Sequence, residues 1–180
     1  GDDVRAIDWR VTARRDKPHT KVFHEQREQP ALVLVDQRQS MFFGSTLRLK
    51  SVAAAELAAR IAWQIVDAGD RVGGIVLDQH SHVLFRPHRV AKKVGRFLAQ
   101  ISAANHQLSR IHTDEIAPIT DQTAILVEGL RALEQLKQDR YRIFIVSDFA
   151  DDSEAWSLGI NRLARKNKIH LLQIWDALDS

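Results

Sequence analysis

The sequence predicts an α/β domain of three layers, in which helices cover both faces of a mainly parallel sheet. Three observations favour this class. Short, continuously apolar runs, typical of strands buried on both faces, alternate with longer segments of helical periodicity. One pair of strand-like runs lies close enough in sequence to form a hairpin, which makes one strand antiparallel. The length of 180 residues suits a single domain with a substantial core.

The chain divides near Pro30. Residues 1–30 are dense in charge and poor in aliphatic side chains, whereas residues 31–36 form an apolar run that predicts a buried strand. We interpret the opening as a charged segment that packs on the domain of residues 31–180; an interaction surface is the alternative. The charged residues around its Trp9 are Asp2, Asp3, Asp8 and Arg14.

The elements after the first strand follow in a regular order. Residues 48–68 are apolar nearly all round, with one narrow polar stripe at helical spacing, and predict a largely buried helix. Residues 72–77 and 82–85 are expected to pair as a hairpin around the turn at 78–81. The remaining expected elements are helices around 90–101 and 125–136, a strand at 142–148, a helix around 156–163 and a strand at 169–175.

Composition limits the classes of protein. The 44% hydrophobic and 27% charged content is typical of a folded globular chain. No apolar run approaches the roughly 20 residues needed to cross a bilayer. The absence of cysteine excludes disulfides, thiolate metal sites and thiol nucleophiles, and fits a reducing compartment. We therefore expect a cytoplasmic domain without membrane contact. Because the first residue is Gly1, we also expect a fragment whose parent protein is a candidate for membrane tethering.

Charge argues against a nucleic-acid tail. The net charge of +3 arises from 26 basic and 23 acidic residues scattered along the chain. The basic clusters are interpreted as solvated helix faces, so no nucleic-acid partner is expected; binding through them is the alternative, and it predicts a steep salt dependence. These clusters are Lys92, Lys93 and Arg96, and then Arg162, Arg165 and Lys166.

Two aspartates stand where apolar strands end. In open parallel sheets, ligands bind beyond the carboxyl ends of the strands, where the strand order reverses, and both Asp36 and Asp148 are expected there. Carboxylate and hydroxyl oxygens are the ligands that Mg²⁺ prefers, and Ser40 and Thr123 could complete such a set. The alternative is that the two aspartates merely cap the following helices.

This arrangement resembles the metal-ion-dependent adhesion site of von Willebrand factor A domains, which implies a Rossmann-like fold. The whole chain is also similar to the bacterial family called domain of unknown function fifty-eight. That resemblance is carried by Gly1-Asp-Asp-Val-Arg-Ala-Ile-Asp-Trp-Arg-Val-Thr-Ala-Arg14, Phe23-His-Glu-Gln-Arg-Glu28, residues 36–41, Gln122-Thr-Ala-Ile125, Ser147-Asp-Phe149 and Trp175-Asp-Ala-Leu-Asp179.

By this resemblance, Asp36, Ser40, Thr123 and Asp148 take the adhesion-site positions and are candidate ligands for Mg²⁺ or Mn²⁺. The first serine of the Asp-x-Ser-x-Ser pattern is Arg38 here. A guanidinium can bind a carboxylate through two parallel hydrogen bonds and supply positive charge, so weak or absent metal binding is expected. In the alternative, Arg38 is a solvated side chain that points away. The same five residues are the expected partner-binding site.

The leading hypothesis is a non-catalytic module that binds a protein partner at the carboxyl edge of the sheet. The resemblance implies that this partner is a MoxR-type AAA+ ATPase, in the assembly or activation of other proteins. The chain has no Gly-x-x-x-x-Gly-Lys-Ser/Thr loop, no Gly-x-Gly-x-x-Gly after a strand and no Gly-x-Ser-x-Gly elbow. Common nucleotide and hydrolase chemistries therefore lose support.

Two chemical alternatives stay open. A magnesium-dependent phosphoesterase would use Asp36 and Asp148 as ligands, and would also need a nearby acid or base. The candidates for that role are Asp121, Asp151 and Asp152. A zinc site is the other alternative, because alternate positions of the predicted hairpin carry Asp78, His80 and His82.

Overall fold

The computed structural model describes residues 29–42, 44–45, 48–110, 119–136, 139–150 and 153–176. The predicted charged segment around Trp9 lies outside these residues, apart from Gln29 and Pro30. The five-stranded sheet follows directly after Pro30.

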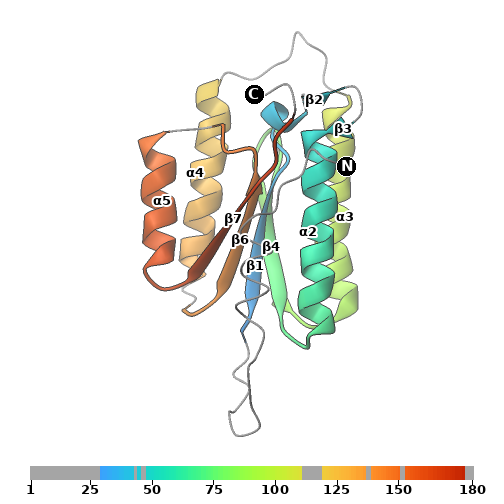
Figure 1. Cartoon of the computed structure of the whole chain (residues 1–180), viewed down its shortest axis with the longest axis vertical. Helices are drawn as coiled ribbons and strands as arrows, with labels where there is room; N and C mark the ends of the chain where they lie inside the picture. Colours follow the sequence, from blue (N-terminus) through green and yellow to red (C-terminus); the bar gives the residue numbers. More distant parts are fainter. Residues whose placement is uncertain are drawn as a thin grey trace, which may run out of the picture.

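The sheet has the order β5-β4-β1-β6-β7 (Figure 1). Its central strand β1 (Ala31–Asp36) pairs in parallel with β4 (Val72–Leu77) and with β6 (Arg142–Ser147). Strand β7 (Lys168–Gln173) is parallel to β6, whereas β5 (His82–His88) is antiparallel to β4. The carboxyl ends of β1, β4, β6 and β7 therefore meet at one edge, which we call the carboxyl edge.

Helices cover both faces of the sheet (Figure 1). Helices α2 (Lys50–Asp67) and α3 (Ala91–Leu108) share one hydrophobic core with one face of the sheet. Helices α4 (Ile119–Gln135) and α5 (Glu154–Ala164) share the other. A 3₁₀ turn, η1 (Gln39–Met41), and a ribbon of β2 (Gly44–Ser45) and β3 (Arg48–Leu49) join β1 to α2. The predicted three-layer fold with one antiparallel strand is confirmed.

The central strand belongs to both cores. Successive side chains of a strand point to opposite faces, so Val33 and Val35 pack with α2 and α3, while Leu32 and Leu34 pack with α4 and α5. All four are fully buried, and burying each such side chain contributes roughly 1.5–3 kcal/mol. This is why the first apolar run of the sequence shows no alternation with polar residues.

Several boundaries differ from those predicted. Strand β5 extends to His88 and α3 continues to Leu108, so both elements run beyond their predicted ends. Helix α2 is largely buried, as predicted: its exposed positions are those of the polar stripe, Glu56, Arg60, Gln64 and Asp67, together with Trp63, which is 40% exposed. Among the described helices, none combines the length and apolarity needed to cross a membrane.

Candidate functional site

The carboxyl edge brings together the ends of β1 and β6. These strands pair in parallel up to Val35 and Val146, which sets Asp36 beside Ser147. The Ser147 hydroxyl donates to Asp36 Oδ2 over 2.7 Å. Asp148 follows on the same strand end, so adjacent strand ends carry the two carboxylates that the sequence singles out. Both are buried.

Arg38 binds Asp36 through a two-pronged ion pair. Its Nε donates to Asp36 Oδ1 over 2.9 Å, and its second terminal nitrogen donates to Oδ2 over 2.8 Å. The Arg38 backbone N–H also donates to Oδ1, over 3.0 Å. Only 3% of Arg38 is exposed, so the alternative of a solvated side chain pointing away is wrong.

The Arg38 guanidinium also ties the loop after β1 to the start of α4. Its Nη1 donates to the carbonyl oxygen of Gln122 over 3.0 Å. In return, the Gln122 side-chain oxygen accepts from the backbone N–H of Ser40 over 3.1 Å. Thr123 follows Gln122 and is half-buried, as is Ser40. The structure therefore brings all five predicted site residues to one edge.

A second cation, Lys50, pairs with Asp148. Lys50 Nζ donates to Asp148 Oδ2 over 3.0 Å, and the two side chains are 10% and 4% exposed. The other carboxylate oxygen of Asp148 accepts from the backbone N–H of Ala150 over 3.1 Å. Asp36 and Asp148 are therefore each matched by a side-chain cation.

The surroundings of Asp36 lower its pKa. Burial alone disfavours the ionised carboxylate and raises the pKa. The charge of Arg38 and the hydrogen bonds from Arg38 and Ser147 favour ionisation and outweigh that effect, so the pKa lies below its usual value. Asp36 is accordingly held as a carboxylate.

The residues present do not fit a divalent ion. An ionised carboxylate offers about four acceptor positions. Asp36 accepts four hydrogen bonds, three from Arg38 and one from Ser147. A metal at Asp36 would have to displace the Arg38 guanidinium, which lies within hydrogen-bonding distance of both oxygens. The phosphoesterase alternative, which needs Asp36 and Asp148 as metal ligands, gains no support from this geometry.

Neither aspartate caps a helix. Helix α5 is capped by Ser153, whose hydroxyl accepts from the backbone N–H of Trp156 over 3.3 Å. The N-cap of α2 is Leu49, which makes no side-chain cap hydrogen bond. Asp36 and Asp148 each accept from a backbone N–H two residues further on, within their own loops. The capping alternative is therefore wrong.

The zinc alternative at the hairpin is also wrong. Asp78 Oδ1 accepts from the backbone N–H groups of His80 and Ser81, over 2.7 and 2.8 Å, and so stabilises the turn between β4 and β5. Among the residues that the structure describes, no three His, Cys, Asp or Glu side chains are grouped to hold a metal ion.

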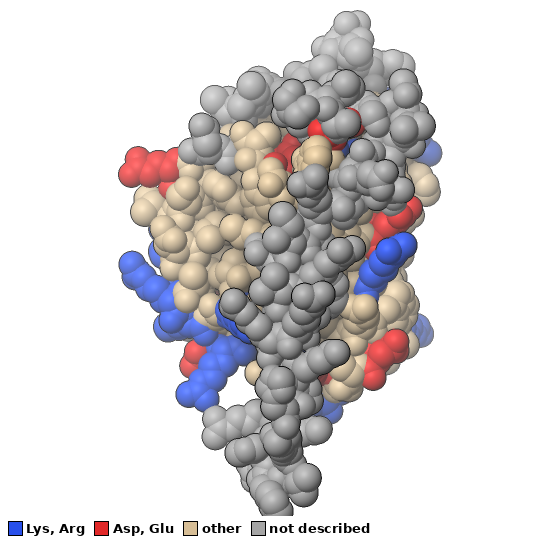
Figure 2. Space-filling view, in the orientation of Figure 1, with Lys and Arg blue, Asp and Glu red and all other residues tan. Residues whose placement is uncertain are grey.

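The other candidates remain untested. Asp151 and Asp152 lie outside the described residues, as does the side chain of Asp121. Of the basic residues singled out, Arg162 is paired with Glu134 over 2.6 Å. On the face shown in Figure 2, basic side chains gather at the lower left with an acidic side chain beside them, and side chains of both signs lie along the right side.

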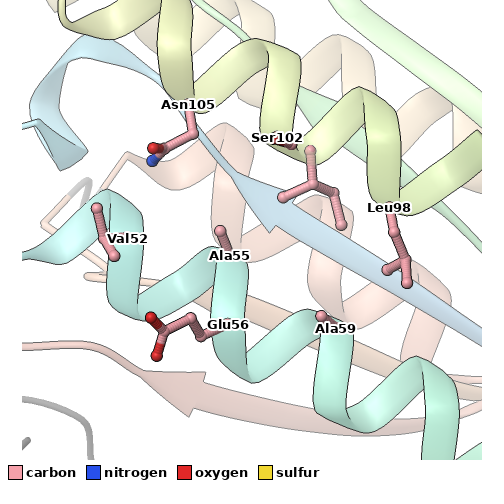
Figure 3. Close-up of a pocket in the computed structure, with 8 residues that line it drawn as sticks. Val52, Ala55, Glu56, Ala59, Leu98, Ser102 and Asn105 are labelled. Carbon is pink, nitrogen blue, oxygen red and sulfur yellow. The ribbon is translucent and has the colours of Figure 1, made fainter.

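A shallow groove opens between α2 and α3, with a volume of about 220 Å³. Figure 3 shows Val52 and Asn105 at one end of it, with Ala59 and Leu98 toward the other. The end at Asn105 adjoins the carboxyl edge, because the Asn105 amide donates to the Gln37 side-chain oxygen over 3.0 Å. Gln37 in turn donates to the carbonyl oxygens of Asp36 and Ser51.

Sequence reasoning missed Lys50, Gln122 and Gln37 as parts of this site. Lys50 carried a usable signal, because a cation in the first turn of a helix is opposed by the helix dipole and favours a nearby carboxylate partner. The glutamines carried none, since their contacts depend on how α3 and α4 are placed beside the loop after β1.

The fold is an α/β domain whose mainly parallel sheet carries two buried ion pairs at its carboxyl edge. The chain belongs to the family described as Protein of unknown function DUF58, which matches residues 1–180. It is 27% identical over 184 residues to uncharacterized proteins of Mycobacterium bovis and Mycobacterium tuberculosis. The alignments cover 99% of this chain and 53% of each relative, so the chain spans about half of their length.

The solved structures that match this chain share little sequence with it. An aerotolerance-related membrane protein of Bacteroides fragilis matches at 16% identity, with a TM-score of 0.43, over 81% of this chain and 67% of its own. The von Willebrand factor A domain of SpRpn10 matches at 11% identity, with a TM-score of 0.41, over 82% of this chain and 89% of its own. A von Willebrand factor type A protein of Catenulispora acidiphila matches at 12% identity, with a TM-score of 0.41, over 79% of this chain and 32% of its own.

Proposed function

We propose that this domain is a non-catalytic protein-interaction module, which engages a protein partner at the carboxyl edge of its sheet. The observation that supports this is the internal pairing of Asp36 with Arg38 and of Asp148 with Lys50. General bases and metal ligands must offer accessible lone pairs to a reactant or ion. Carboxylates bound by neighbouring cations are instead suited to holding loops in a fixed shape.

In this proposal, the loops at the carboxyl edge are held in a fixed shape so that they form a preordered binding surface. Arg38 and Gln122 connect the loop after β1 to α4, and Lys50 connects the start of α2 to the end of β6. A surface that is already ordered loses less conformational entropy when a partner binds. The adjoining groove between α2 and α3 gives that surface a mostly apolar depression for a side chain of the partner.

The partner in this proposal is a MoxR-type AAA+ ATPase, and the joint task is the assembly or activation of other proteins. This part rests on the family resemblance. The domain would present its carboxyl edge to the ATPase. The absence of a phosphate-binding loop in the sequence fits a division of labour in which the ATPase supplies the nucleotide chemistry.

A matched pair of alanine replacements tests the site. Ala55 lines the groove on α2, whereas Ala155 is exposed on α5, on the opposite face of the sheet. We expect Ala55→Arg to weaken binding to the cognate ATPase at least about tenfold in biolayer interferometry, because a buried charge replaces a small apolar contact. Ala155→Arg should bind like the wild type.

Two results would count against the proposal, and they differ. If the wild-type chain does not bind the ATPase, the proposed identity of the partner is contradicted. If both replacements weaken binding equally, or if neither weakens it, the location of the binding site beside the carboxyl edge is contradicted. Thermal unfolding of each variant checks that the comparison is between folded proteins.

A further inference from the structure

At the carboxyl edge, the buried carboxylates of Asp36 and Asp148 are each paired with a buried side-chain cation. Asp36 and Asp148 carry two negative charges, and Arg38 and Lys50 carry two positive charges. A divalent ion bound between the same carboxylates would contribute the same positive charge. The charges of these two carboxylates are thus neutralised by side chains of the chain itself.

Both cations come from the segment that joins β1 to α2, and both are buried. Arg38 is held by its bonds to Asp36 and to the Gln122 carbonyl, and Lys50 is the first residue of α2. Their positions are therefore fixed by the fold, in the way that a bound ion would be fixed by its ligands. Unlike an ion, they cannot dissociate.

We infer that Arg38 and Lys50 together take the place of a divalent ion, so that the adhesion-type site of this chain is closed by its own side chains and is independent of metal. The inference does not rest on the proposed partner, because its tests measure metal binding alone. It also assigns Lys50 a role as the second substitute cation, beside Arg38.

The inference has a second consequence: removing the two cations should create a metal site. Asp36, Ser40, Thr123 and Asp148 would remain at the edge, and Arg38→Ser would add a hydroxyl in the loop after β1. Carboxylates and hydroxyls are the hard oxygen ligands that Mg²⁺ and Mn²⁺ prefer. Lys50→Ala would free the Asp148 oxygen that now accepts from Lys50.

The first experiment uses the wild-type chain. Mn²⁺ is titrated into the ¹⁵N-labelled protein, and paramagnetic broadening of the backbone amide signals reports where the ion binds. We expect no selective broadening of residues 36–40 and 147–150. Selective broadening of these signals at a stoichiometric concentration of Mn²⁺ would overturn the inference, and this result needs no variant to fold.

The second experiment uses the Arg38→Ser/Lys50→Ala variant. We expect the same amide signals to broaden selectively, and calorimetry to show Mn²⁺ affinity higher than that of the wild type by on the order of tenfold or more. Adding Asp36→Asn should abolish the gain, because the exchange removes a carboxylate ligand. A folded double variant that binds Mn²⁺ no better than the wild type would refute the substitution of metal by these two side chains.

Discussion

Asp36 is the residue on which the carboxyl edge depends. It is fully buried, and it accepts hydrogen bonds from Arg38 and Ser147 on both of its oxygens. Removing one partner of a buried ion pair leaves an uncompensated charge and typically costs about 3–5 kcal/mol. Replacing both partners together costs much less, which makes the double variant the informative one.

The lowered pKa of Asp36 predicts a pH dependence of stability. The native state favours the ionised carboxylate, so its contribution is complete above the pKa of the unfolded chain, about 3.9, and is lost as the pH falls through the lower native pKa. We expect the free energy of urea unfolding to fall more steeply below about pH 4 in the wild type than in Asp36→Asn/Arg38→Met. Parallel pH curves for the two proteins would contradict the prediction.

At the scale of elements, strand β4 depends on its glycines. Gly74 packs between β1 and α3, where an added Cβ would collide with the carbonyl oxygen of Val33 and lie 2.6 Å from the ring of Phe97. Gly73 meets β5 in the same way, next to the irregular register between these strands. Close approach of the backbone is thus what brings α3, and with it Asn105, up to the sheet.

Two glycine replacements should act in opposite directions. Gly74→Ala forces the backbone or Phe97 to shift, and we expect it to lower the free energy of unfolding by about 1–3 kcal/mol. Gly95 lies within α3, where an added Cβ has no neighbour within 4 Å. We expect Gly95→Ala to raise the free energy of unfolding by about 0.5–1 kcal/mol. Chemical denaturation of both variants measures the difference, and equal effects would contradict this account of β4.

At the scale of the whole molecule, the two signs of charge nearly balance. The chain carries 26 basic and 23 acidic residues, and side chains of both signs are present on the face seen in Figure 2, with basic ones gathered at its lower left. Binding to nucleic acid draws its affinity from many phosphate contacts and from the release of their counterions. A chain whose acidic residues nearly equal its basic ones provides few such contacts at once.

We therefore predict that the chain does not bind nucleic acid at physiological ionic strength. Fluorescence anisotropy with labelled single-stranded and double-stranded DNA should show no saturable binding near 0.15 M salt. Saturable binding whose affinity falls steeply as salt is added would instead assign the basic faces of α3 and α5 a function, and would replace the interaction module as the leading hypothesis.

Much of the fold follows from local sequence. The apolar run at 31–36 has no polar alternation, which predicts a strand buried on both faces, and the structure confirms this for β1. The hairpin of β4 and β5 was likewise predictable from its spacing. The end of α3 was harder to predict, because three polar residues, 105–107, separate Ala104 from Leu108, although both continue the buried face of the helix.

The sequence by itself determined that Asp36 and Asp148 stand at the ends of apolar strands, and that Arg38 stands where the family pattern has a serine. Only the tertiary structure decided what these charges do. Lys50 lies far from Asp148 along the chain, and Gln122 far from Arg38, yet the packing of α2 and α4 brings each pair into hydrogen-bonding distance. The reason is physical: strand burial is encoded in local periodicity, whereas the pairing of buried charges depends on which distant elements the core brings together.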